Sequence, residues 1–283
     1  MLNHAHLSDF LKRPEPVARL VITDVRGSSP REVGAEMFVR ANGLHGTIGG
    51  GQAEYRAIEA ARNMLAGHHL SDRIEIRLGP EIGQCCGGRI TVDLKRMTAA
   101  DIDAALERAA YEMACYAEVY VLGAGHVGRA LANLLQHMPV RTILIDPRLD
   151  ELAMNRAAVE TRNSVLPEVD IAAANPGSAF VVLTHDHGLD FLLASAALSR
   201  GDAAYVGMIG SVTKRAKLAS WARGQSDALQ LDDLVCPIGT GGSRDKRPAV
   251  IAAFVAAEVM ARLTGDMHSQ RNSHEALPLY AAE

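Results

Sequence analysis

The segment GQCCGGRITV places two adjacent thiols, Cys85 and Cys86, between glycine residues and just before an alternating, strand-like run. Neighbouring cysteines form a disulfide only in a strained ring, so we do not expect a bridge between them. Glycine contributes no side chain to a core, and a glycine-flanked loop allows a ligand to approach the backbone and the sulfur atoms together. The pair is therefore either a ligand-binding site or two inert thiols in a turn.

A second glycine loop, GTIGGGQAE, runs into a segment with helical periodicity. The backbone amides of Gly49, Gly50 and Gly51 could bind an anion at the start of that helix, or the glycines could serve only a tight strand-to-helix corner. Glu54 lies one turn into the helix. Its carboxylate could accept hydrogen bonds from an amino-substituted ring, or it is an exposed charge near the positive end of the helix dipole.

A third glycine segment, GAGHVG, follows an apolar strand and opens a helix. Gly123, Gly125 and Gly128 have the spacing of a Rossmann fingerprint, and Asp146 ends the next predicted strand about twenty residues later. The pattern favours a nucleotide or another phosphate ligand, or a fold whose turn simply needs glycine. Arg148 could bind a phosphate or form only a salt bridge with Asp146.

The segment THDHGLD follows another predicted strand and contains His185, Asp186, His187 and Asp190. Ligands of open parallel sheets bind at the carboxyl ends of the strands. Two histidines could contribute to a metal site, but the rest of a ligand set does not follow in the sequence. A polar pocket rim or capping of the next helix are the alternatives.

The segment GMIGSVTKR repeats this arrangement, with Ser211 and Lys214 after a strand and at the start of a helix. Three successive strand ends thus carry glycine-rich or polar loops. Their combination predicts a pocket at one edge of the sheet.

The order of the predicted elements gives an α/β fold class, with an N-terminal α+β domain followed by a Rossmann-like doubly wound parallel-sheet domain. We expect a hairpin with a type I′ turn at Asn42-Gly43 in the first domain. The predicted boundaries form four segments: the N-terminal domain with the cysteine loop at 1–100, a linker helix at 101–117, the Rossmann-like domain at 118–265, and a tail at 266–283.

The composition excludes several classes of protein. Apolar residues make up 48% of the sequence and charged residues 22%, which is typical of a globular protein. The net charge of −4 argues against a general nucleic-acid binder. The apolar stretches carry regular charges and no signal peptide is recognised, so we expect no membrane association, a cytoplasmic location and reduced cysteines.

Taken together, these motifs resemble the XdhC/CoxI family, the xanthine dehydrogenase accessory proteins. The matching segments run in order from about residue 26 to residue 255: GSSPREVGAEM, GTIGGGQAE, GQCCGG, VLGAGHVG, LIDPR, LTHDHGLD, GMIGS, CPIG and KRPAVIAA. This combination is far more specific than the glycine fingerprint alone.

The resemblance implies a chaperone for the molybdenum cofactor (molybdopterin), which is its cargo, rather than an enzyme. Such a protein protects the cofactor, supports its sulfuration by a cysteine desulfurase, and delivers it to the xanthine dehydrogenase molybdenum subunit, with a molybdenum insertion protein as a further partner. We also expect a homodimer. An NAD(P)-dependent oxidoreductase is the alternative, but it leaves the cysteine loop unexplained, and a separate nucleotide at the Rossmann turn is not favoured.

The resemblance also gives the residues a role. Cys86 matches the family's Cys-Gly-Gly core, and Cys86 with Cys85 would bind the molybdenum of the cofactor, because thiolate is a soft ligand. The remaining residues expected to bind the cofactor are Gly49, Gly50, Gly51, Glu54, Gly123, Gly125, Gly128, Asp146, Arg148, His185, Asp186, His187, Ser211 and Lys214.

Overall fold

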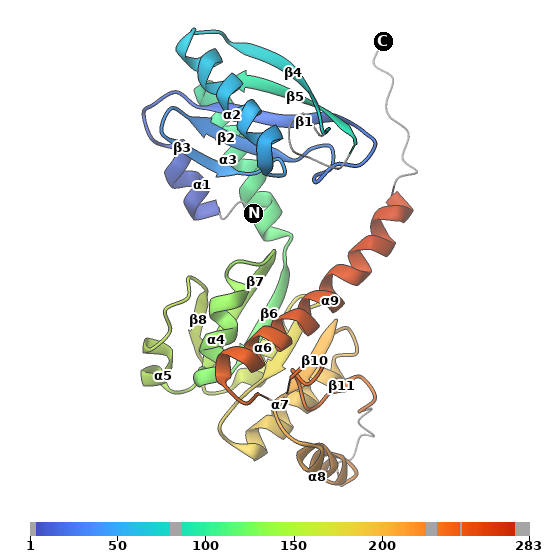
Figure 1. The fold of residues 1–283 in the computed structure, drawn as a ribbon. Coiled ribbons are helices and arrows are strands. Elements are labelled where there is room, and N and C mark those ends of the chain that lie inside the picture. The colour runs from blue at the N-terminus through green and yellow to red at the C-terminus, as the bar shows by residue number, and fades with distance from the viewer. Residues whose placement is uncertain (1–3, 80–86, 225–230, 244, 275–283) are drawn as a thin grey trace. The chain divides into compact units, whose positions relative to one another are not determined.

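The computed structural model describes residues 4–79, 87–224, 231–243 and 245–274. The chain divides into two units, Met1–Ala114 and Cys115–Glu283 (Figure 1). The predicted α/β class is confirmed, because one unit contains an antiparallel sheet and the other a parallel sheet. Each unit is described by itself below.

The first unit is a five-stranded antiparallel sheet with strand order β3-β2-β1-β5-β4. Its described elements are α1 (His4–Leu11), β1 (Ala18–Arg26), β2 (Glu36–Arg40), β3 (Gly43–Gly46), α2 (Gly51–Ala66), β4 (Ser71–Arg77), β5 (Arg89–Arg96) and α3 (Ala99–Ala114). Alternation along β1 and β5 directs apolar side chains such as Leu20 and Val92 towards α2. On the other face, Phe38 of β2 packs with α1 and α3.

We expected residues 101–117 to form a linker helix, but α3 packs on the first unit. Ala105 and Ala109 are buried together with Leu7 and Phe10 of α1. The helix is therefore part of the first core, and the division between the units lies after Ala114.

The predicted hairpin is confirmed, with β2 and β3 paired through Arg40 and Gly43. The predicted turn type is wrong. A type I′ turn needs positive φ at both central residues. The central residues are Ala41 and Asn42, and neither has a positive φ.

The second unit is a six-stranded parallel sheet with strand order β11-β10-β9-β6-β7-β8. This is the Rossmann order, in which the first strand of the unit, β6, lies between its second and fourth strands. Its elements are β6 (Ala117–Leu122), α4 (His126–Leu135), β7 (Val140–Asp146), α5 (Leu149–Ala153), β8 (Glu160–Asn163), α6 (Pro167–Ala173), β9 (Ala179–Val182), α7 (His187–Ser199), β10 (Tyr205–Met208), α8 (Val212–Ala222), β11 (Leu234–Val235) and α9 (Pro248–His274).

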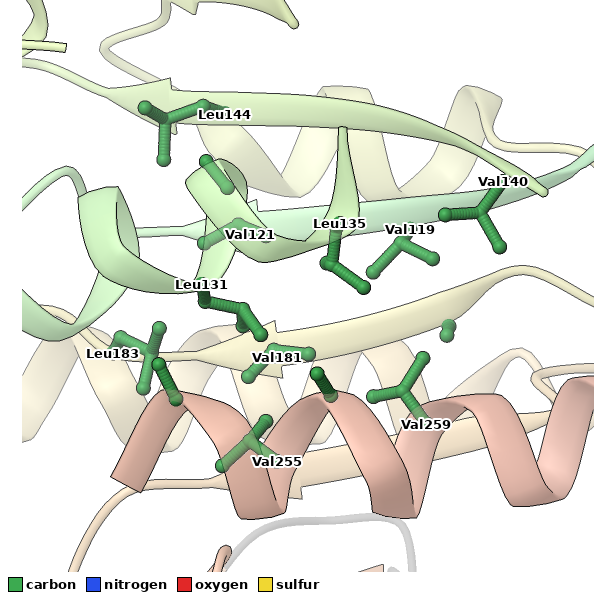
Figure 2. Close-up of a cluster of buried hydrophobic side chains, with 14 of the residues drawn as sticks. Val119, Val121, Leu131, Leu135, Val140, Leu144, Val181, Leu183, Val255 and Val259 are labelled. Carbon is green, nitrogen blue, oxygen red and sulfur yellow. The ribbon is translucent and has the colours of Figure 1, made fainter. Parts of the chain in front are cut away.

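Two apolar layers cover this sheet, one on each face. Figure 2 shows the first layer, where Val121 and Val181 of the sheet meet Leu131 of α4 and Val255 and Val259 of α9. The second layer packs Phe180 and other inward-facing residues against α6, α7 and α8. Strands buried on both faces explain the continuous apolar runs in this half of the sequence.

The helix α9 is a core helix of the second unit. By length and composition, its segment Pro248–Gly265 is apolar enough to cross a membrane. Its apolar face instead packs against α4 and the sheet. Glu258 on the same helix accepts hydrogen bonds from the Gly239 amide (2.9 Å) and the Tyr205 hydroxyl (3.0 Å). The packing against α4 and the sheet accounts for the apolar residues on that face, and 28% of the segment Pro248–Gly265 is buried.

Candidate functional site

Three loops of the first unit lie against one another at one end of the sheet. Ser28 forms an isolated parallel β-bridge with Gly87. A Cβ atom on Gly88 would lie 2.1 Å from the carbonyl oxygen of Ser28, and one on Gly49 would lie 2.6 Å from Cγ of Pro30. These contacts require glycine at positions 49 and 88, because any side chain there would displace a neighbouring loop.

Cys85 and Cys86 lie outside the described residues, but the chain that follows them is described. Gly87 directly follows Cys86 in the sequence and has φ of +65°, with open space where a Cβ atom would lie. Its amide donates to the carbonyl of Leu78 (2.9 Å), and the amide of Leu78 donates to the carbonyl of Gly88 (2.8 Å). The residues that flank the cysteine segment, Leu78 and Gly87, therefore close the end of the β4–β5 hairpin, and Gly87 lies against the loop that contains Ser28.

The carboxylate of Glu54 stabilises the glycine loop at 47–50 by accepting hydrogen bonds from it. Its Oε2 accepts hydrogen bonds from the hydroxyl of Thr47 and from the amides of Ile48 (2.9 Å) and Gly50 (3.0 Å). The amide of Gly49 donates to the Thr47 hydroxyl (3.0 Å). An incoming anion would therefore compete with a carboxylate of the chain itself.

Gly51 differs from its two neighbours. It is the first residue of α2, and the amides of the first helical turn have no partner within a helix. Gly50 beside it has open space where a Cβ atom would lie. The anion-binding role of Gly49, Gly50 and Gly51 and the ring-binding role of Glu54 stay predictions. Because the amides of Gly49 and Gly50 already donate within the chain, we expect a ligand of this loop to contact the Gly51 amide.

The three glycines of the Rossmann turn in the second unit have different tasks. A Cβ atom on Gly123 would lie 2.5 Å from the carbonyl oxygen of Leu183, so this glycine allows β6 and the end of β9 to approach. A Cβ atom on Gly128 would lie 1.9 Å from the carbonyl oxygen of Gly123, so this glycine allows α4 to pack on its own turn. Gly125 has open space at the same position, and it precedes α4 with no side-chain cap. Of the three, only Gly125 leaves room for a ligand at the helix N-terminus.

Alanine at these two positions should therefore have different effects. Gly128→Ala should lower the free energy of unfolding of the second unit by about 1–3 kcal/mol, because its Cβ overlaps a carbonyl oxygen. Gly125→Ala should cost less than about 1 kcal/mol, the preference of a helix N-cap for glycine over alanine. Urea unfolding followed by the fluorescence of Trp221, the single tryptophan, would measure both. Equal losses of stability would contradict the assignment of Gly125 to open space.

Asp146 supports the glycine turn and is saturated by the chain itself. Its Oδ2 accepts from the Ala124 amide (2.7 Å) and from Nη2 of Arg148 (2.9 Å), and its Oδ1 accepts from the Arg148 amide and Nε, both at 2.9 Å. Burial alone would raise the pKa of Asp146, but these hydrogen bonds outweigh it and hold the pKa below its ordinary value. A carboxylate has about four acceptor positions, so none remains for the ribose hydroxyl of a dinucleotide.

His185, Asp186 and His187 lie at the point where the strand order reverses. They follow β9, which pairs with β6 on the side opposite β7, and all three side chains are exposed. Asp186 caps α7, since its carboxylate accepts from the amide of Leu189 (2.9 Å). The backbone amides of Leu189 and Gly188 lower the pKa of Asp186 below its ordinary value. Ligands of doubly wound sheets bind where the strand order reverses, so these three residues lie at a typical ligand-binding position.

The metal interpretation of the two histidines gains no support from their surroundings. No group of three or more His, Cys, Asp or Glu side chains that could hold a metal ion is found within residues 4–79, 87–224, 231–243 and 245–274. The carboxylate of Asp190 is not free to join His185 and His187, because it accepts from the Thr184 amide (3.0 Å) and hydroxyl (2.7 Å).

Lys214 is not the exposed cation that its place in a strand-end loop suggests. Its side chain is buried, and its ammonium forms an ion pair with Asp190, which is 0% exposed, and donates to the carbonyl of Ile209 (2.9 Å). Ser211 caps α8 by accepting from the Lys214 amide (3.2 Å). The pair thus joins the start of α7 to the start of α8, and Lys214 acts as a brace for the loops that carry the exposed residues.

The structure therefore sorts the predicted residues into two groups in separate units. In the first unit, the loop at 27–34 lies beside Gly49 and beside Gly87 and Gly88, which follow the cysteine pair in the sequence. In the second unit, Gly125 and the segment 185–187 follow neighbouring strands. The sequence analysis missed two side chains that support these loops. Thr47 supports the glycine loop at 49–51. Arg129 supports the Rossmann turn, because it donates to the carbonyl of Ala124 (2.5 Å) and pairs with Glu151.

A shallow groove of about 680 Å³ on the open face of the first sheet is a further cavity. Its three cations are paired with carboxylates: Arg19 with Glu36, Arg73 with Asp93 and Lys95 with Asp101. Because each cation has a carboxylate partner, the groove has little net positive charge, and its described residues show no specific site for an anionic small molecule.

Two protein-family models match this sequence. The model described as the XdhC Rossmann domain matches residues 119–259, and the model described as the XdhC and CoxI family matches residues 10–74. The first match falls within the parallel-sheet unit and the second within the antiparallel-sheet unit, so both units of the chain are covered.

The chain is also similar to one curated protein and to one solved structure. The uncharacterized protein YqeB of Escherichia coli strain K12 is 33% identical over 122 residues, which make up 42% of this chain and 19% of YqeB. The match thus spans about a fifth of the length of YqeB. A crystal structure described as a xanthine dehydrogenase from Bacillus halodurans has a TM-score of 0.76 and 16% sequence identity, covering 94% of this chain and 96% of that one. This similarity shows a shared fold.

Proposed function

The chain belongs to the XdhC and CoxI family, and from this premise we propose that it is an accessory protein in the maturation of xanthine dehydrogenase. Its cargo is the molybdenum cofactor. It binds and protects the cofactor while a cysteine desulfurase supports sulfuration, and then delivers it to the molybdenum subunit of xanthine dehydrogenase, with a molybdenum insertion protein as a further partner. In this role it catalyses no reaction of its own, and it acts in the cytoplasm.

One observation supports this proposal most directly: the loops of the first unit lie together where the cysteine segment ends. The Ser28–Gly87 bridge and the approach of Gly88 to Ser28 place the loop at 27–34 beside the residue that follows Cys86. Thiolates suit a soft molybdenum centre with sulfur ligands. Gly50 and Gly87, the residue that directly follows Cys86 in the sequence, both have open space where a Cβ atom would lie, which leaves room for a bulky group. We therefore propose Cys86 and Cys85 as the protein ligands of the cargo.

The second unit adds an anion-binding edge of its own. We propose that Gly125, with its open space at the N-terminus of α4, binds a phosphate group, and that the exposed His185 and His187 border that position. The saturated carboxylate of Asp146 argues against the alternative of an NAD(P)-dependent oxidoreductase, in which that carboxylate would accept from ribose.

Purification from a host that makes the cofactor tests the proposal. The full chain should retain both molybdenum, measured by elemental mass spectrometry, and pterin, measured by its fluorescence after oxidation. The same chain from a host that cannot make pterin should contain neither. The loaded chain should also restore activity to cofactor-free xanthine dehydrogenase. A chain that retains no pterin from the competent host would contradict the proposal.

A further inference from the structure

The strand β4 is a free edge of the first sheet. It ends the strand order, has β5 as its one neighbour among the described strands, and is seven residues long (Figure 1). Long free edges present unpaired backbone groups that can pair with another chain.

The hydrogen-bond pattern shows which residues of β4 face outwards. The amide of Arg96 donates to the carbonyl of Leu70, and the amide of Leu78 donates to the carbonyl of Gly88, both at 2.8 Å. The β4–β5 register has no bulge, so the even-numbered residues of β4 bond to β5. The odd-numbered residues therefore direct their N–H and C=O groups to the free edge: Ser71, Arg73, Glu75 and Arg77.

The side chains of these outward-bonding residues alternate in charge. Arg73, Glu75 and Arg77 are exposed and share the face of the sheet opposite α2. Ile74, on the other face, is only half-buried at the edge of the core, beside the buried Ile76. Charged side chains on an edge strand usually protect it against pairing, and like charges protect it in every register. This strand instead carries opposite charges two residues apart.

We propose that β4 pairs antiparallel with β4 of a second copy of this chain, about a two-fold axis at Ile74. In this register Arg73 of each copy lies directly opposite Glu75 of the other, and both are outward-bonding residues that can exchange two backbone hydrogen bonds. Ile74 lies opposite Ile74 of the second copy, which covers its exposed part. The two five-stranded sheets become one continuous sheet.

Charge excludes the two adjacent registers, and an axis at Ile76, which also pairs Glu75 with Arg77, leaves Arg73 opposite the uncharged Gly79. An axis at Arg73 places Arg73 opposite itself, and an axis at Glu75 places Glu75 opposite itself, so both bring like charges together. A shift by one residue would pair outward-bonding residues with residues that already bond to β5. In the proposed register, Asp93, Arg73 and the second copy's Glu75 form a row of alternating charge across three strands.

The other edge of this sheet offers no comparable surface. The strand β3 is four residues long, with glycine at both ends, Gly43 and Gly46. Its short length and its lack of alternating charge give no register in which two copies are complementary. Of the two edge strands of this sheet, β4 is therefore the one on which a second copy can pair.

Charge reversal tests the proposal in the full chain. By sedimentation and light scattering, the wild-type protein should be a dimer of twice the 30.2 kDa chain mass. Either Arg73→Glu or Glu75→Arg should weaken self-association about tenfold or more, because two attractive cross-strand pairs become repulsive. A mixture of the two variants should form a heterodimer, because the two glutamates on β4 of the Arg73→Glu variant lie opposite the two arginines on β4 of the Glu75→Arg variant.

A matched control separates the interface from general charge effects. Glu107→Arg reverses an exposed charge on α3, away from the β4 edge, and should leave the dimer unchanged. Circular dichroism would confirm that each variant is folded. A monomeric wild-type chain, or charge-reversed variants that dimerise as well as the wild type, would each overturn the proposal.

Discussion

The Cys85→Ala/Cys86→Ala variant is expected to lose nearly all the molybdenum and pterin that the wild-type chain retains from a cofactor-producing host. The proposed metal ligands are the two thiolates, and a methyl side chain cannot bind molybdenum. Because the change removes only two sulfur atoms next to the glycines, the fold should persist. Elemental analysis for molybdenum, pterin fluorescence and circular dichroism on one preparation would measure these outcomes.

Single variants and a control sharpen this test. Cys86→Ala should lose more cofactor than Cys85→Ala, because Cys86 belongs to the Cys-Gly-Gly core of the family pattern. Cys115, an exposed free thiol, provides the matched control, and Cys115→Ala should retain the cofactor fully. Undiminished retention by the double variant would exclude the cysteine pair as the metal site. Retention by the wild-type chain separately measures whether the protein binds the cofactor at all.

Much of the fold could be predicted from the sequence because its signals are local. The change from antiparallel hairpins to alternating strands and helices identifies the two sheets, and the spacing of Gly123, Gly125 and Gly128 identifies the first turn of the Rossmann unit. The prediction of a type I′ turn was wrong because the strand register places Ala41 and Asn42, rather than Asn42 and Gly43, at the centre of the turn. The position of one residue in a register depends on cross-strand packing, which the local sequence does not contain.

The candidate site was less predictable because side-chain partners come from distant parts of the chain. Glu54 was expected to bind a ligand, but its carboxylate accepts hydrogen bonds from Ile48 and Gly50. Asp146 has the position of a ribose-binding carboxylate, but Arg148 and Ala124 saturate it. In both cases a residue type that suits a ligand also suits the support of the loop that would bind it. The three-dimensional structure is needed to separate these two roles.

Lys214 was also expected to bind a ligand and instead supports loops, through its buried ion pair with Asp190. We therefore expect a large loss of stability when it is replaced. Lys214→Met should lower the free energy of unfolding of the second unit by about 3–5 kcal/mol, the usual cost of removing one partner of a buried ion pair. The carboxylate left behind, Asp190, is 0% exposed and would retain only its hydrogen bonds from Thr184. Urea unfolding followed by Trp221 fluorescence would measure the loss, because this tryptophan lies on α8 itself.

Two further variants distinguish the ion pair from other effects of the substitution. Lys217→Met removes an exposed lysine from the same helix and should change the free energy of unfolding by no more than about 0.5 kcal/mol. Asp190→Asn/Lys214→Met removes both charges, while the amide oxygen introduced at position 190 can still accept from Thr184, so the double variant should be more stable than Lys214→Met alone. If the double variant is the less stable of the two, the uncompensated charge is not the cause. A brace of this kind also predicts a local consequence: in Lys214→Met, the amides of Thr184 and Ile209 should exchange hydrogen faster than those of β7, because the pair joins the loops after β9 and β10.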